Sequence, residues 1–387
     1  MLGLVVVLLA PPVAVSIDRV GEQVLSAAKS IDPTAIRKGG DRPEVGASSG
    51  HQEQGSVAPS ADSGIRAMIV AELNRQATAL RGGDRAGFLA PADPADVPLR
   101  SELDRRCSTL QAMKVANWTE TVTGRLTPGA DNRWSAQVQL RYCFVVDTCT
   151  PVGVTIGTGW VVTGDRARLT AFGASPADQI GPRPWEVSEL QSVIGKRVIV
   201  SATKRWASRL PGILAGAERA AAITDRFSKW TPVPTRYVVY VAGPDEWAQW
   251  YGVRQASWVA AYAMPLTDTY TEIVLNGSRV GAADSREVLQ HEFTHVVTLA
   301  GVQRTYPDSW WLIEGIAEYV QNVGAPLGLY RALADGRRYV RGGAWNGSVA
   351  LGEPDARAST SEANGRYAVA LLAVRRLVDR FGARLVT

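Results

Sequence analysis

The segment 291–295, HEFTH, constrains this chain more than any other feature. It contains two of the three histidines in the protein, four residues apart, with Glu292 between them. In an α-helix, residues four apart lie one above the other on the same face, so His291 and His295 can hold one divalent metal ion together. Asp284 or Ser285 provides an N-cap, and apolar residues cover most of the remaining helix surface. The sequence therefore predicts a largely buried helix carrying a metal site. The alternative is a core helix with two hydrogen-bonded histidines.

A second helix is predicted at 309–322, SWWLIEGIAEYVQN, with Ser309 as its N-cap. Glu314 and Glu318 are again four residues apart, on an otherwise apolar helix. Burying such a pair is costly unless a cation or hydrogen bonds compensate the charge. Glu314 follows His295 by 19 residues, which is enough for a turn and a helix that returns past the first. The alternative for this pair is a solvated helix face.

Together, HEFTH and WLIEGIAEY resemble the gluzincin group of zinc metallopeptidases, and within it the peptidase MA-like family. The resemblance implies that His291, His295 and Glu314 are zinc ligands and that Glu292 is the general base. It also implies that Glu318 is the carboxylate that orients His291, although thermolysin has Asp rather than Glu at this place.

Two further elements acquire a role through the same resemblance. Related sequences have a tyrosine at the start of the helix after the ligand helix, which implies Tyr367 as the donor to a developing oxyanion. The alternative is that Tyr367 only packs in an amphipathic helix. The run 271–276, TEIVLN, lies where the gluzincin fold has an edge strand that binds the substrate backbone. It can equally be an ordinary strand of the sheet.

The set of residues is chemically coherent. Three protein ligands leave the fourth position of zinc open, which is typical of catalytic rather than structural sites. The predicted function is zinc-dependent hydrolysis of peptide bonds, with a peptide or protein as substrate. Two alternatives stay open: a non-catalytic extracytoplasmic binding module with a structural zinc site, and a zinc hydrolase of a non-peptide amide. The presence of Glu292 favours a hydrolase, because a structural site needs no base.

The start of the chain predicts export. Residues 1–16 contain an apolar run that indicates a signal or signal-anchor segment, although a buried strand is the alternative. Residues 17–63 are rich in Gly, Ser, Pro and charge and predict a disordered linker, in which His51 is not a ligand. We therefore expect an extracytoplasmic protein, membrane-anchored or secreted, that meets the membrane only through this segment. A disulfide between Cys143 and Cys149 fits that location. Three reduced thiols, Cys107 included, are the alternative.

A chain of 387 residues predicts more than one folded domain. Residues 64–180 read as helices followed by a meander of strands, an α+β accessory domain similar to NTF2-like domains. Residues 181–206 read as a connector, and 207–387 as a mostly helical gluzincin-like zinc peptidase domain with a small sheet. The net charge of +5 is spread without a basic stripe interleaved with aromatic residues, so we expect no nucleic-acid partner.

Overall fold

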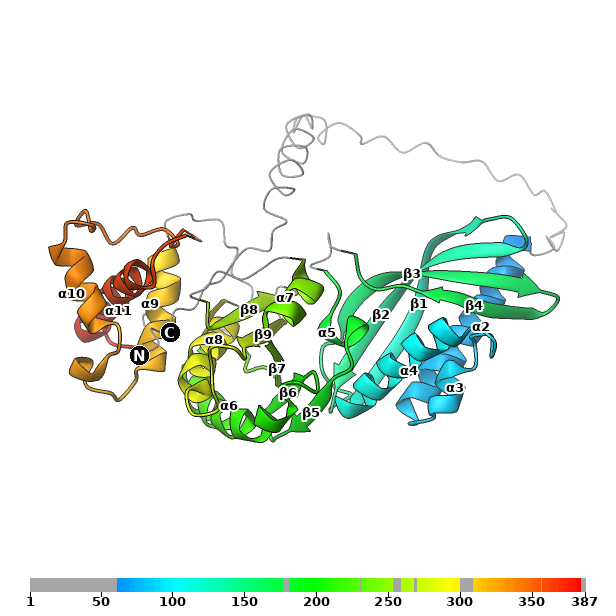
Figure 1. Ribbon diagram of the computed structural model, residues 1–387, viewed down its shortest axis with the longest axis horizontal. Helices are drawn as coiled ribbons and strands as arrows, with labels where there is room; N and C mark the ends of the chain where they lie inside the picture. The colour runs from blue at the N-terminus through cyan, green and yellow to red at the C-terminus, as the bar shows by residue number, and fades with distance from the viewer. Residues whose placement is uncertain are drawn as a thin grey trace, which may run out of the picture.

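The computed structural model describes residues 61–176, 181–229, 232–252, 259–267, 270–299, 309–355 and 357–383. The predicted segment 1–16, residues 17–60 of the predicted linker and His51 lie outside these ranges. The fold class is α+β, as predicted, with one antiparallel sheet and one mixed sheet. Figure 1 shows the N-terminal helices and sheet at one end, the mixed sheet in the middle and helices α9 to α11 at the other end. In the described ranges, no helix combines the length and apolar character needed to span a membrane.

The N-terminal unit packs three helices on an antiparallel sheet. The helices are α2 (Ala61–Arg81), α3 (Arg85–Leu89) and α4 (Val97–Ala112). The strands β1 (Val115–Pro128), β2 (Arg133–Phe144), β3 (Val152–Thr163) and β4 (Arg166–Phe172) pair in chain order. The Asp84 carboxylate caps α3 by accepting from the Gly87 N–H at 2.9 Å. Helix α2 begins at Ala61, so residues 61–63 of the predicted linker are helical.

The expected link between the two cysteines after β2 is present. Cys143, near the end of β2, forms a disulfide with Cys149 in the connection to β3. Cys107 is a free, buried thiol on α4. Since the two bonded cysteines lie six residues apart, the disulfide closes the β2–β3 connection locally and leaves the pairing of the four strands to their backbone ladder.

The second unit is built on a five-stranded sheet in the order β5-β6-β7-β9-β8. Its strands are β5 (Gln191–Ile194), β6 (Val198–Ala202), β7 (Tyr237–Ala242), β8 (Ala261–Pro265) and β9 (Thr271–Asn276). Strands β6, β7 and β9 are parallel, while β5 and β8 run antiparallel at the two edges. Strands β5 and β6 come from the segment 181–206, which the sequence analysis treated as a connector. The predicted edge position of 271–276 is wrong: β9 is an interior strand, and β8, which the sequence analysis missed, forms the edge.

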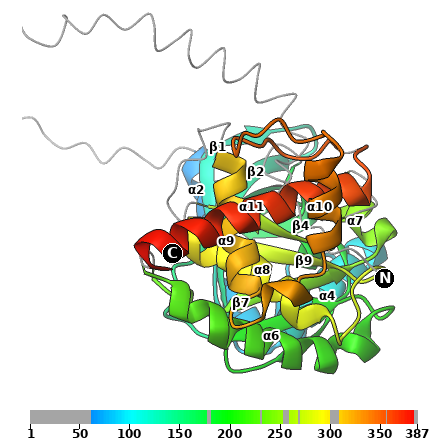
Figure 2. The same ribbon diagram turned by 90° about the vertical axis from the view of Figure 1, so that its left-hand side faces the viewer.

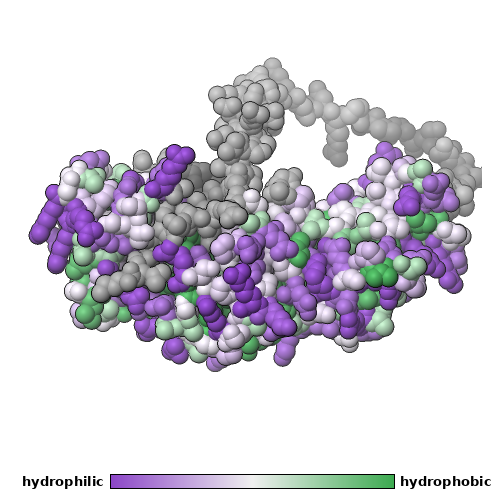
Figure 3. Space-filling model, in the orientation of Figure 1, coloured by the Kyte–Doolittle hydropathy of each residue, from purple (hydrophilic) through white to green (hydrophobic). Residues whose placement is uncertain are grey.

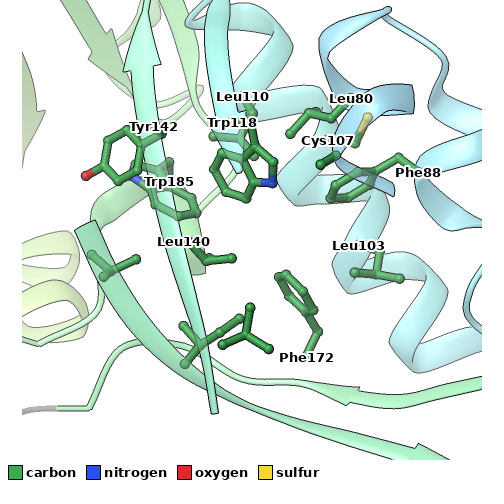
Figure 4. Close-up of a cluster of buried hydrophobic side chains, with 14 of the residues drawn as sticks. Leu80, Phe88, Leu103, Cys107, Leu110, Trp118, Leu140, Tyr142, Phe172 and Trp185 are labelled. Atoms are coloured by element: carbon green, nitrogen blue, oxygen red, sulfur yellow. The ribbon is translucent and has the colours of Figure 1, made fainter. Parts of the chain in front are cut away.

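Different elements pack on the two faces of the mixed sheet. On one face, helices α6 (Leu210–Thr224) and α8 (Ser285–Leu299) enclose a core with Ile273 and Leu275 of β9. On the other face, Val274 joins a core that continues into the N-terminal unit. Trp185 of α5 (Pro184–Val187) is buried at this junction, with its ring edge-on to Trp118 and Tyr142 (Figure 4). The N-terminal unit and the mixed sheet therefore share one continuous hydrophobic core, which alternate residues of the strands supply.

Four further α-helices belong to the described part of the chain, together with the short 3-10 helices at Ala207–Arg209, Asp225–Phe227 and Leu327–Leu329. Helix α7 (Pro244–Tyr251) follows β7, while α9 (Trp310–Gln321), α10 (Leu333–Arg341) and α11 (Thr360–Phe381) form the C-terminal end. Figure 2 shows α11 crossing in front of α8 and α9. Gly315 lets α9 approach α11 closely, because a Cβ built there would lie 2.6 Å from the Ala370 carbonyl oxygen. On the face drawn in Figure 3, the surface over α10 is strongly hydrophilic, and exposed Arg337, Arg338 and Arg341 belong to this helix.

Candidate metal centre

Helix α8 carries three of the predicted site residues. His291, Glu292 and His295 are all buried, at 0 to 2% exposure. The helix is held in place on both sides: Phe293 stacks on Tyr237 of β7, and Gln290 donates its side-chain N–H to the carbonyl oxygen of Val320 on α9. The HEFTH helix therefore lies between the mixed sheet and α9, and its predicted burial is confirmed.

Helix α9 brings Glu314 to the two histidines. The Glu314 Oε2 atom lies 3.1 Å from His291 Nε2 and 3.5 Å from His295 Nε2. One ligand atom from each residue can be chosen so that all lie within 4.8 Å of one another. Ligand atoms bound at about 2.0 Å in a tetrahedral arrangement lie about 3.3 Å apart. The spacing of Glu314 to both imidazoles is therefore that of ligands around one small divalent ion.

The three residues also fit such an ion electrostatically. Burial would lower the pKa of His291, but hydrogen bonds and charges from Glu314 and Glu318 outweigh it and raise the pKa above the usual range. Burial would raise the pKa of Glu314, but the two histidines outweigh it and lower the pKa. The Glu314 Oε1 atom has no hydrogen-bond partner among the described residues. A fully buried carboxylate facing two imidazoles is a position that a divalent cation stabilises.

Glu292 differs from the other acidic residues of the site. Its side chain is fully buried, and neither carboxylate oxygen has a hydrogen-bond partner of ordinary geometry within the described ranges. Burial raises the pKa of Glu292 to about 8, against the opposing effects of His291 and of the backbone N–H of Ala263 on β8. A carboxyl group with a pKa near neutrality is suited to accepting and releasing a proton.

The Nδ1 atom of His291, which faces away from Glu314, has two oxygen neighbours on α9. It lies 3.0 Å from Gln321 Oε1 and 3.4 Å from Glu318 Oε1. Burial, and then the nearby negative charge of Glu318, raise the pKa of Tyr330 well above its usual range. The structure thus places Glu318 beside His291, as the resemblance implied, but it adds Gln321 at the shorter distance. Sequence reasoning missed Gln321, although its position one turn after Glu318 on the same helix face was a usable signal.

Tyr367 lies at the edge of the same centre. Its ring centroid is 6.3 Å from that of His291 and 5.1 Å from that of Trp310. The side chain is buried, and its hydroxyl has no hydrogen-bond partner among the described residues. Burial, with added negative charge from Glu314 and Glu318, raises its pKa well above the usual range, so the hydroxyl keeps its proton. Tyr367 therefore packs in α11 and also borders the candidate centre, and its role as a donor to an oxyanion stays a prediction.

The structure therefore brings together all six residues that the sequence singled out, from α8, α9 and α11. The donor set of two imidazoles and one carboxylate matches the ligands that zinc takes in hydrolytic sites. Comparisons of the chain with models of known protein families and with curated proteins find no match. The resemblance to gluzincins accordingly rests on the motif residues and on how they are arranged.

Proposed function

We propose that this protein is a zinc-dependent metallopeptidase. The observation that carries the proposal is Glu292, a fully buried carboxylate that no side chain among the described residues hydrogen-bonds, beside a cluster of two histidines and Glu314. A cluster that only stabilised the fold would have no need of a second, uncompensated carboxylate, because burying one is costly. Glu292 therefore favours a hydrolase over a non-catalytic module with a structural zinc site.

Each residue has a distinct role in the proposed reaction. His291, His295 and Glu314 hold the ion, which when bound supplies a Lewis acid that polarises the scissile carbonyl and lowers the pKa of water to about 7. Glu292 accepts a proton from the attacking water and delivers it to the leaving amine. The Tyr367 hydroxyl, which retains its proton, donates to the oxygen that gains negative charge. Gln321 and Glu318 keep His291 Nε2 directed at Glu314 by binding the opposite ring nitrogen.

A peptide substrate is favoured by the edge strand beside the base. Within the described ranges, strand β8 pairs with β9 alone, and the backbone N–H of Ala263 on β8 acts on Glu292. An extended peptide can add to such an edge through main-chain hydrogen bonds, which would hold its carbonyl groups close to Glu292. An amide that is not part of an extended chain would make no use of this edge.

The substitution Glu292→Gln tests the proposal. It preserves the shape of the side chain and the three ligands but removes the base. We expect one zinc per chain by elemental analysis in both wild type and variant, and a loss of about 10² to 10⁴-fold in peptide hydrolysis. Glu287→Gln, on the same helix but partly exposed, is the matched control and should keep its activity. Undiminished hydrolysis by the Glu292→Gln variant would contradict the mechanism.

A further inference from the structure

The last turn of α9 carries both oxygen atoms that contact His291. Glu318 Oε1 and Gln321 Oε1 lie 3.4 Å and 3.0 Å from His291 Nδ1, and α9 ends at Gln321. The last carbonyl groups of an α-helix have no partner within the helix, so such a turn frays unless donors outside the helix bind it. The orientation of His291 therefore depends on how the end of α9 is held.

Gln290 on α8 holds this end. It directly precedes His291, and its side chain is buried. The Gln290 Nε2 atom donates to the Val320 carbonyl oxygen at 2.5 Å and to the Gln321 carbonyl oxygen at 3.4 Å. These are the last two carbonyl groups of α9. Gln290 thus caps the C-terminal end of α9 from the helix that carries the histidines.

Gln290, His291 and Gln321 form a closed ring of contacts. Gln290 and His291 are consecutive on α8, and the side chain of Gln290 binds the backbone of Gln321. The Gln321 side chain in turn contacts the His291 ring. The backbone of Gln290 is itself fixed, because its carbonyl oxygen accepts from Thr294 Oγ1 at 2.7 Å and from Thr224 Oγ1 of α6 at 3.4 Å. Two separate contacts with α8 therefore set the place of Gln321.

We propose that Gln290 is a positioning residue for His291 and, through it, for the metal ion. Its amide group holds the last turn of α9 so that Gln321 accepts the Nδ1 proton of His291. The opposite ring nitrogen, Nε2, is then unprotonated and faces Glu314, as a metal ligand must. Gln290 acts through Gln321 and not through the ion. This inference rests on the proposed zinc site and names a residue to which the resemblance to gluzincins gives no role.

A double-mutant cycle of zinc affinity tests this route. Gln290→Met nearly keeps the length and volume of the side chain but has no N–H to donate. In a chelator competition, Gln290→Met should bind zinc about tenfold more weakly than wild type. In a Gln321→Ala background the same substitution should cost no more than about twofold, because the contact through which Gln290 acts is already lost. Losses that simply add would show that Gln290 only stabilises the fold, and would overturn the inference.

Thr298→Val is the matched control for Gln290→Met. It also removes one side-chain hydrogen bond from α8, since Thr298 Oγ1 donates to the Thr294 carbonyl oxygen at 2.7 Å, but this bond does not cross to α9. Thr298→Val should bind zinc as tightly as wild type. A loss in the control equal to that in Gln290→Met would overturn the specific role of the cap.

Hydrogen exchange of the metal-free protein tests the cap without zinc. The backbone amides of Val320, Gln321 and Asn322 should exchange about tenfold or more slowly in wild type than in a free peptide of the same sequence, and Gln290→Met should reduce this protection. Exchange at the peptide rate in wild type would overturn the cap even if the variant fails to fold. Equal zinc affinity in wild type and Gln290→Met would overturn the inference and leave the zinc site intact. A wild type that binds no zinc would overturn the proposed function and the inference together.

Discussion

Replacing Gly315 by alanine tests how closely α9 must approach α11 to position Glu314. A Cβ at residue 315 would lie 2.6 Å from both the Ala370 carbonyl oxygen and the Val374 Cγ2 atom. Ordinary contacts between such atoms are about 3.3 to 4.0 Å, so the helices must separate by roughly 0.7 Å or more. Overpacking of this kind costs about 1 to 3 kcal/mol, against about 1 kcal/mol that alanine gains in helix propensity. Because one of the two contacts is with backbone, which cannot move aside easily, we expect a cost at the upper end of this range. After the gain in helix propensity is subtracted, the net destabilisation is about 2 kcal/mol.

Gly64→Ala is the matched control for this substitution. Gly64 lies in α2, and nothing stands within 4 Å of a Cβ built there, so alanine should stabilise the fold by up to about 1 kcal/mol. Denaturant unfolding of the metal-free proteins measures both changes separately from zinc binding. Gly315→Ala should also weaken zinc binding about tenfold, because Glu314 is the adjacent residue. The packing argument is refuted if both substitutions stabilise the protein, or if Gly315→Ala keeps wild-type zinc affinity.

Two further predictions concern buried polar groups. Gln321→Ala removes the closest acceptor of His291 Nδ1 and should lower zinc affinity by about 10 to 100-fold in a chelator competition, with a smaller effect for Glu318→Gln. A larger loss of zinc affinity for Glu318→Gln than for Gln321→Ala would mean that the carboxylate is the main partner of His291, as the resemblance to gluzincins implies. Burial raises the pKa of Glu272 to about 7, against the effect of Arg183. The folded state therefore holds this proton more tightly than the unfolded chain, and the free energy of unfolding should fall by about 3 kcal/mol between pH 4.5 and 7 on account of this group. Glu272→Gln should flatten that fall in denaturant titrations at several pH values, whereas an unchanged slope would show that Glu272 does not cause it.

The local elements of this protein follow from the sequence because their causes are local. Helix α8 is predicted by the spacing of its apolar residues. The four N-terminal strands follow from alternating residues between turns. Helical spacing places His291 and His295 on one face, and Glu314 and Glu318 on another. The roles predicted for these residues, for Glu292 and for Tyr367 came from the resemblance to gluzincins.

Only the tertiary structure decides how those elements meet. Strand β8 was missed because AYAMP is short and gives no alternation, and β9 is interior because β8 pairs with its outer side. Gln321 becomes a partner of His291 because α9 packs against α8. The spacing along one chain determines which side chains share a helix face. Which faces come together depends on packing between segments far apart in sequence, and here that packing decides what surrounds the two histidines.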